Sequence, residues 1–131
     1  DLHSFPTRRS SDLRAALTGG VIALIGGAAL LAVSESPGIV NFSAATVAFL
    51  LGMGIANPLG TAMTLQPFGA KAGVASALLG FLQMASAALG TALTAGIEMP
   101  PPVALGLLMT GGSAVGVMLL LVRLRLRETP E

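Results

Sequence analysis

The segment Ala72–Ile97 reads AGVASALLGFLQMASAALGTALTAGI and contains no charged side chain. It is longer than the roughly 20 apolar residues that an α-helix needs to cross about 30 Å of hydrocarbon. Its apolar residues do not alternate with polar ones, as they would in a strand of a membrane β-barrel. The segment is therefore predicted to be a transmembrane helix.

Three further segments have the same character when the chain is read outward from this one. Ser43–Leu65 precedes it, Val103–Val122 follows it, and Ala15–Val33 lies nearest the N-terminus. Turns that contain proline separate the segments, at Ser36-Pro37-Gly38, Pro67-Phe68-Gly69 and Pro100-Pro101-Pro102. The predicted fold class is all-α, a polytopic membrane helix bundle with four transmembrane helices.

The composition excludes several other classes of protein. Only 10% of the 131 residues are charged and 53% are hydrophobic, whereas about 25% of the residues of a soluble domain are charged. The absence of cysteine excludes a disulfide-stapled secreted module. A net charge of +1 does not supply the basic face that nucleic-acid binding needs. We therefore expect a lipid bilayer, and no nucleic acid, as the partner of this chain.

The basic residues predict how the helices are oriented, because cytoplasmic loops of membrane proteins carry an excess of Lys and Arg. Beyond residue 13, every basic residue flanks the same side of the predicted bundle: Arg14, Lys71, Arg123, Arg125 and Arg127. The loops on the other side carry only Glu35 and Glu98. Both ends of the chain are therefore expected in the cytoplasm.

Residues 1–13 differ from the remainder of the chain. They are polar, basic and rich in Ser and Arg, which is typical of a short cytoplasmic arm. The segment His3–Leu13, however, resembles the translation of a common short-read sequencing adapter. We therefore expect residues 1–13 to be a non-native tail left by misassembly of the gene, with native sequence beginning near Arg14. His3, the single histidine, then supports no metal or catalytic hypothesis.

Small residues recur inside the predicted helices, where they would weaken a helix in water by about 1 kcal/mol each. In a bilayer such residues let helix backbones approach closely, so a packing role is expected for them. The first helix offers Gly19, Gly20, Gly26 and Gly27. The third and fourth helices offer Gly73, Ser76, Gly80, Ser86, Gly90, Gly112 and Gly116.

The second and third helices carry the polar features of the predicted bundle. Pro58 displaces the carbonyl of Gly54 and predicts a kink near the middle of the second helix. Asn57 and Gln83 are amides near mid-membrane, either parts of a polar pathway or interhelical hydrogen-bond partners. The Ser and Thr hydroxyls are expected to bond to their own helix backbone.

Ionisable side chains are absent from all four predicted spans. An ion-coupled transporter needs such a group within the membrane, so coupling chemistry is not expected in this part of the bundle. The spans also lack a metal-binding cluster and a nucleophile with its base. We therefore expect no catalytic residue, no metal, no cofactor and no enzymatic activity.

The stretch Gly52–Met84 reads GMGIANPLGTAMTLQPFGAKAGVASALLGFLQM. It resembles the Bcr/CflA drug-resistance branch of the major facilitator superfamily, in which two late helices carry Gly-x-Gly before Pro, then Pro-Phe, then Ala-Gly-x-Ala-Ser-Ala-Leu-x-Gly. The matching elements here are Gly52 and Gly54, Pro58, Pro67-Phe68, Ala72-Gly73, Ala75–Leu78, Gly80 and the closing Leu82-Gln83-Met84.

The resemblance implies that residues 14–131 are the C-terminal part of a major facilitator transporter domain, helices nine to twelve of twelve. It implies a multi-pass protein of the bacterial inner membrane that exports small molecules in exchange for protons by alternating access. In that family the tenth and eleventh helices border the central cavity, which makes Asn57, Gln83, Met53 and Phe81 candidates for the substrate pathway. The N-terminal helices, which hold the coupling acids, would be partners that this chain lacks, so it is expected to be inactive alone.

Two other functions fit the same four helices. One is a self-sufficient four-helix exporter that acts as a dimer, although such exporters depend on a Glu inside the first helix and none lies between Arg14 and Glu35. The other is a membrane scaffold subunit that does not transport, which nothing in the sequence excludes.

Overall fold

The computed structural model describes residues 5–34, 38–96 and 98–128, and these residues are helical apart from short connections. The four α-helices are α1 (Phe5–Ala32), α2 (Ile39–Leu65), α3 (Ala72–Ala95) and α4 (Pro101–Glu128). A 3₁₀ helix, η1 (Gln66–Lys71), joins α2 to α3. The all-α prediction is confirmed. The expected turn at residues 36 and 37 and the charge of Glu35 lie outside the described residues.

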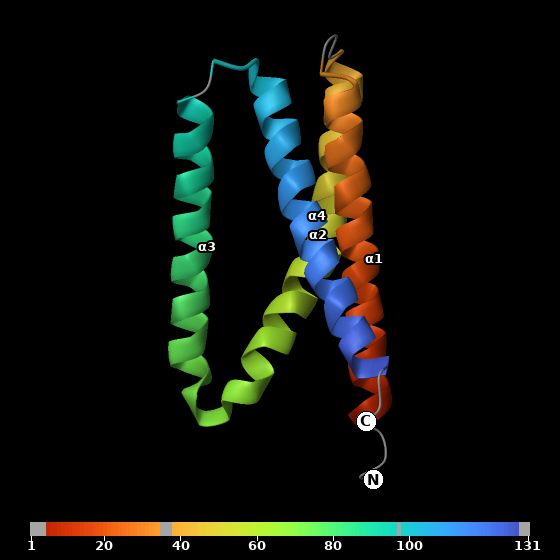
Figure 1. Ribbon diagram of the computed structural model, residues 1–131, viewed down its shortest axis with the longest axis vertical. Helices are drawn as coiled ribbons and strands as arrows, with labels where there is room; N and C mark the ends of the chain where they lie inside the picture. The colour runs from red at the N-terminus through yellow and green to blue at the C-terminus, as the bar shows by residue number, and fades with distance from the viewer. Residues whose placement is uncertain (1–4, 35–37, 97, 129–131) are drawn as a thin grey trace.

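Three helical stretches of the described chain are long and apolar enough to cross a membrane: Ser11–Ala32, Ile39–Ala95 and Pro101–Leu126. The middle stretch reverses direction at Gly69, the one described glycine with a positive φ (φ 43°, ψ −116°), so that α2 and α3 run in opposite directions (Figure 1). Glycine is suited to this position because it has no Cβ to clash. The predicted turn at Pro67-Phe68-Gly69 is confirmed, and the three stretches indicate a multi-pass membrane protein.

Helix α1 packs against both α2 and α4, and glycines make the contacts close. A Cβ on Gly26 would lie 2.5 Å from the backbone nitrogen of Phe49 in α2, and a Cβ on Gly27 would lie 2.8 Å from that of Thr110 in α4. Larger residues there would force the helices apart, since the obstructing atoms belong to the backbone. The expected packing role of the glycines in the first helix is confirmed at these positions.

The small residues of α3 and of the second half of α4 are placed differently. A Cβ on Gly73, Gly80, Gly112 or Gly116 would meet nothing within 4 Å, and one on Gly90 would only touch Leu108 at 3.9 Å. Ser76 is exposed and bonds to the carbonyl of Gly73. These residues therefore contact almost no other helix in the described part of the chain, and their packing role stays a prediction. The described glycines that pack closely against another helix are Gly19, Gly20, Gly26, Gly27, Gly52 and Gly106.

Helix α2 leaves α1 part-way along its length. Its first half lies against α1, with Gly52 and Ala56 close to Gly19. Its second half diverges from α1 toward the base of α3 (Figure 1). Pro58 lies inside the helix just after the last of these contacts. This is the place where the sequence predicts a kink, because the ring of Pro58 cannot share the turn with the carbonyl of Gly54.

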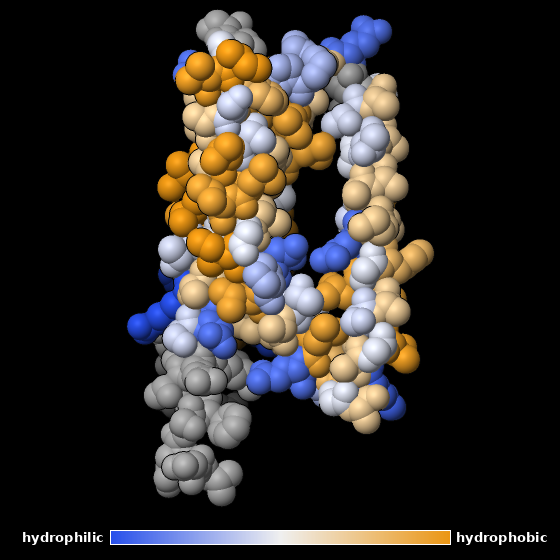
Figure 2. Space-filling view, turned by 180° about the vertical axis from the view of Figure 1, so that it is seen from behind, coloured by the Kyte–Doolittle hydropathy of each residue, from blue (hydrophilic) through white to orange (hydrophobic). Residues whose placement is uncertain are grey.

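Helix α3 stands apart from the other helices. None of its residues is buried, and it is joined to α2 through η1, with few direct contacts between the two helices (Figure 1). At its other end it comes near α4, where Gly90 faces Leu108. An open hollow separates most of α3 from the rest of the molecule, and hydrophilic atoms project into it (Figure 2).

The helices extend beyond the predicted spans at the charged end. Helix α1 begins at Phe5 rather than near Ala15, continues without a break through residue 14, and buries Leu13 to 2% exposure. Helix α4 continues to Glu128 rather than ending at Val122. Both extensions carry arginine, whose long side chain can keep its charge in water while its stem lies along a helix. The proposed origin of residues 1–13 stays a prediction.

Candidate functional site

A cavity of about 680 Å³ lies where α2, α3 and α4 face one another, with part of α1 at its wall. Its volume is in the range of pockets that hold small molecules, about 300–1,000 Å³. Most of the wall is apolar, and the polar residues come from three helices. They are Asn57, Thr61 and Thr64 of α2, Gln83 of α3, and Ser113 and Arg123 of α4.

Three of the four predicted pathway residues share this cavity. Asn57 and Met53 line it from α2, and Gln83 lines it from α3. Phe81 does not line it and is 67% exposed on α3. The separation follows from helix geometry, since residues 81 and 83 are two apart and point to different sides of an α-helix.

The two amides lie in the cavity without neighbours to bond. Within the described residues, the side chains of Asn57 and Gln83 form no hydrogen bond, and both are exposed. An amide offers two N–H donors and a carbonyl acceptor. The cavity thus presents free polar groups from two helices that stand apart across the hollow seen in Figure 2.

Two of the three described hydroxyls that line the cavity, those of Thr64 and Ser113, are bonded to their own helices, as the sequence predicts, whereas Thr61 forms no such bond. Thr64 Oγ1 donates to the carbonyl of Gly60 at 2.8 Å, and Ser113 Oγ donates to the carbonyl of Met109 at 2.7 Å. Their donors are therefore occupied, while their oxygens can still accept a hydrogen bond from a ligand.

Two glycines on α4 leave room for the cavity. Gly112 and Gly116 line it and have no atom within 4 Å of a Cβ position. Because they lie four residues apart, they occupy the same face of α4. In the described structure the absence of side chains at these two positions widens the hollow, and the packing role that the sequence predicts for the pair stays a prediction.

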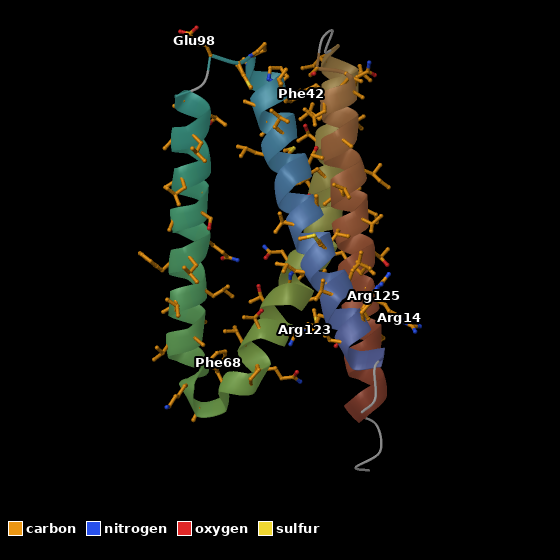
Figure 3. All side chains as sticks on the ribbon, viewed as in Figure 1. Arg14, Phe42, Phe68, Glu98, Arg123 and Arg125 are labelled. Carbon is orange, nitrogen blue, oxygen red and sulfur yellow. The ribbon has the colours of Figure 1, made fainter. Side chains whose placement is uncertain are left out.

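Charge is distributed unevenly along the bundle. Arg14, Arg123 and Arg125 lie toward the end at which α4 terminates, and Glu98 lies at the opposite end (Figure 3). Lys71 belongs to η1, which also lies at the basic end (Figure 1). The predicted segregation of basic residues is present in the part of the chain whose side chains the structure describes.

Arg123 is the cavity residue that sequence reasoning did not find. In the sequence, Arg123 serves only to predict the orientation of the helices in the membrane. It follows a long apolar segment, as an arginine that flanks a membrane helix ordinarily does. The fold brings it to the wall of the cavity, where it is the single charged residue in the part of the lining that the structure describes. A signal was present, since residue 123 lies seven positions after Gly116, two helical turns along the same face.

The described residues contain no group of three or more His, Cys, Asp or Glu side chains that could hold a metal ion.

No family model, curated protein or solved structure matches this chain.

Proposed function

We propose that this chain supplies four membrane-spanning helices of a small-molecule efflux transporter, with the fold and the alternating-access mechanism of the major facilitator superfamily. The cavity between α2, α3 and α4 is the part of the substrate pathway that this chain contributes. The proposal rests on the resemblance of the stretch from Gly52 to Met84 and on the placement of its two amides.

The observation that carries the proposal is that Asn57 and Gln83 line one cavity without bonding to each other or to another described side chain. Polar groups that only tie helices together would be paired, because lipid offers no alternative partner. Unpaired amides in an open hollow are what a water-filled pathway requires. This supports the pathway interpretation of the two residues over the packing interpretation.

The basic end of the bundle is proposed to face the cytoplasm of a bacterial cell, with the protein in the inner membrane. Positive residues at that end include Arg14, Lys71, Arg123 and Arg125, and retention of Lys and Arg on the cytoplasmic side is the general rule for short loops. In this orientation the cavity charge of Arg123 lies toward the cytoplasm.

Cysteine labelling tests the pathway, and the absence of native cysteine makes each single-cysteine variant unambiguous. In vesicles, cysteines at Asn57 and Gln83 should react with a small water-soluble maleimide at rates at least about tenfold above that of a cysteine at Phe81, because a thiol reacts as the thiolate and hydrocarbon suppresses ionisation. Phe81 is the matched control because it is on α3 but outside the cavity. Equal, slow labelling at all three positions would contradict a water-filled pathway.

Proton-driven transport by this polypeptide alone is expected to be absent. The described cavity lining contains no acidic residue that could take up and release a proton, and the coupling acids are proposed to lie in partner helices. Vesicles that contain only this chain should therefore release a fluorescent substrate at the rate of empty vesicles when a pH gradient is imposed. Release that depends on the gradient would instead favour the self-sufficient dimeric exporter.

A further inference from the structure

Among the described residues that line the cavity, one is charged, and it is the positive Arg123. No described Asp or Glu lines the cavity, and Arg123 forms no ion pair or hydrogen bond with another described residue. A guanidinium that lacks an acidic partner can accept a carboxylate, sulfonate or phosphate through two parallel N–H···O bonds. Arg123 is exposed at the basic end of the bundle, where such an anionic group can reach it (Figure 3).

The remaining wall is suited to an alkyl chain. Leucines of α3 and α4 line the cavity, namely Leu79, Leu108, Leu119 and Leu120. Leu108 also lines a second hollow of about 230 Å³ at the opposite end of α3, together with Leu93 and Leu107. An apolar surface therefore extends from the region of Arg123 toward the acidic end of the bundle.

We infer that the cavity binds an anionic amphiphile, with the anionic head group on Arg123 and the alkyl chain between α3 and α4. A cationic amphiphile is disfavoured because Arg123, the one charged residue in the described lining of the cavity, would repel its head group. A neutral one would leave Arg123 without an ionic partner. The amides of Asn57 and Gln83 can donate hydrogen bonds to polar atoms near the head group.

This inference deepens the proposed function and rests on it only in regarding the same cavity as a transport pathway. The chemistry is shared by two sources, a free single-chain amphiphile and an anionic phospholipid of the bilayer. Both place an anionic group near the membrane surface above an alkyl chain, so the experiment needs an arm for each.

Electron paramagnetic resonance of spin-labelled probes measures binding directly, with the complete chain in nanodiscs of phosphatidylcholine. The first arm compares an alkyl sulfonate with an alkyl trimethylammonium of the same chain length. The sulfonate should show an association constant at least about tenfold higher, since ionic hydrogen bonds are among the strong ones. The second arm compares labelled phosphatidylglycerol with labelled phosphatidylcholine. A preference confined to the sulfonate identifies a free amphiphile, and an equal or larger preference for phosphatidylglycerol identifies a membrane lipid.

Two pairs of variants locate the site. Arg123→Gln should remove the preference for the anionic probe, whereas Arg125→Gln should keep it, because Arg125 is on the same helix but does not line the cavity. Gly116→Leu should fill the hollow and weaken binding of the sulfonate by roughly tenfold, whereas Gly111→Leu should not, since both glycines have open space around them but only Gly116 lines the cavity. Arg123→Lys should keep the charge preference, and circular dichroism verifies that every variant is helical.

The inference is overturned if both head groups bind equally, or if Arg123→Gln and Arg125→Gln lose the preference to the same extent. The proposed function fails separately, when cysteines at Asn57 and Gln83 prove inaccessible to water. If the anionic probe binds preferentially but the cysteines at positions 57 and 83 are inaccessible, the cavity is a binding site for a lipid or amphiphile and not a transport pathway. If those cysteines are accessible but no anion preference is found, the cavity is a pathway for another class of substrate.

Discussion

Gly52→Leu is expected to separate α1 from α2 and to lower the free energy of unfolding by about 3 kcal/mol, at the upper end of the range for overpacking a close contact. A Cβ on Gly52 would collide with the backbone of Ala23 and would lie 2.5 Å from the carbonyl oxygen of Gly19. Backbone atoms cannot rotate out of the way as a flexible side chain can. The helices must therefore move apart and lose the contacts along their shared face. Reversible unfolding in mixed micelles, followed by circular dichroism, measures the change.

Gly54→Leu is the matched control for this prediction. Gly54 is on the same helix, two residues further along, and a Cβ there would meet nothing within 4 Å. Leu also has a higher helix propensity than Gly, so this variant should be as stable as the unaltered chain or slightly more stable. Similar destabilisation by both substitutions would show that the close approach of α1 and α2 does not hold the bundle together.

Pro58→Ala is expected to straighten α2 and to bring its second half toward α1. The substitution restores an N–H that can bond to the carbonyl of Gly54 and removes the ring that displaces it. Residues 58–65 span roughly 12 Å at 1.5 Å per residue, so loss of a kink greater than about 20° moves the end of the helix by roughly 4 Å or more. Distance measurement between spin labels at Arg14 and Gln66, both exposed, should detect the shorter separation.

Pro102→Ala provides the control for the kink. Pro102 lies in the first turn of α4, which begins at Pro101, and an N–H at that place has no carbonyl partner within the helix. The distance between Arg14 and Gln66 should therefore stay unchanged. A shift in this variant as large as that in Pro58→Ala, or no shift in either, would mean that something other than Pro58 directs α2 away from α1.

Helix α3 packs against no other described helix along most of its length. Its own sequence and the faces that α2 and α4 leave open explain this. Its small residues allow a close approach, but α1 already occupies the sides of α2 and α4 that carry backbone-to-backbone contacts. Large apolar side chains on α3, such as Leu78, Phe81 and Leu89, stay exposed. In a bilayer this exposure has little cost, because lipid tails are as apolar as leucine. The hollow beside α3 is thus compatible with a membrane setting.

Several elements follow from the sequence with few alternatives. Long uncharged apolar segments can satisfy their backbone hydrogen bonds in lipid only as helices or closed barrels, and the lack of alternation leaves helices. Prolines and Gly69 place the turn between α2 and α3. The two amides are identifiable because they are strongly polar residues in apolar surroundings. The self-bonded hydroxyls follow from the short reach of Ser and Thr side chains.

The helix boundaries at the basic end could not be predicted by hydropathy. A span predicted from hydropathy stops where charged residues begin. The helices α1 and α4 continue past that point, through Asp12 and Arg125 respectively. Backbone hydrogen bonding continues as long as the residues favour a helix and the charged groups reach water. Hydropathy therefore measures the membrane-crossing part of a helix, and the helix itself is longer.

The sequence by itself determined the helical class, the membrane setting, the position of the turn at Gly69 and the segregation of charge, because each depends on local composition or on backbone chemistry. Only the tertiary structure decided which glycines pack and which leave a hollow. Gly52 and Gly116 both lie inside long apolar segments, and they differ in whether another helix lies opposite. It also decided that Asn57, Gln83 and Arg123 meet around one cavity while Phe81 does not. Such meetings depend on how three separate helices are turned and spaced, and no single segment contains that information.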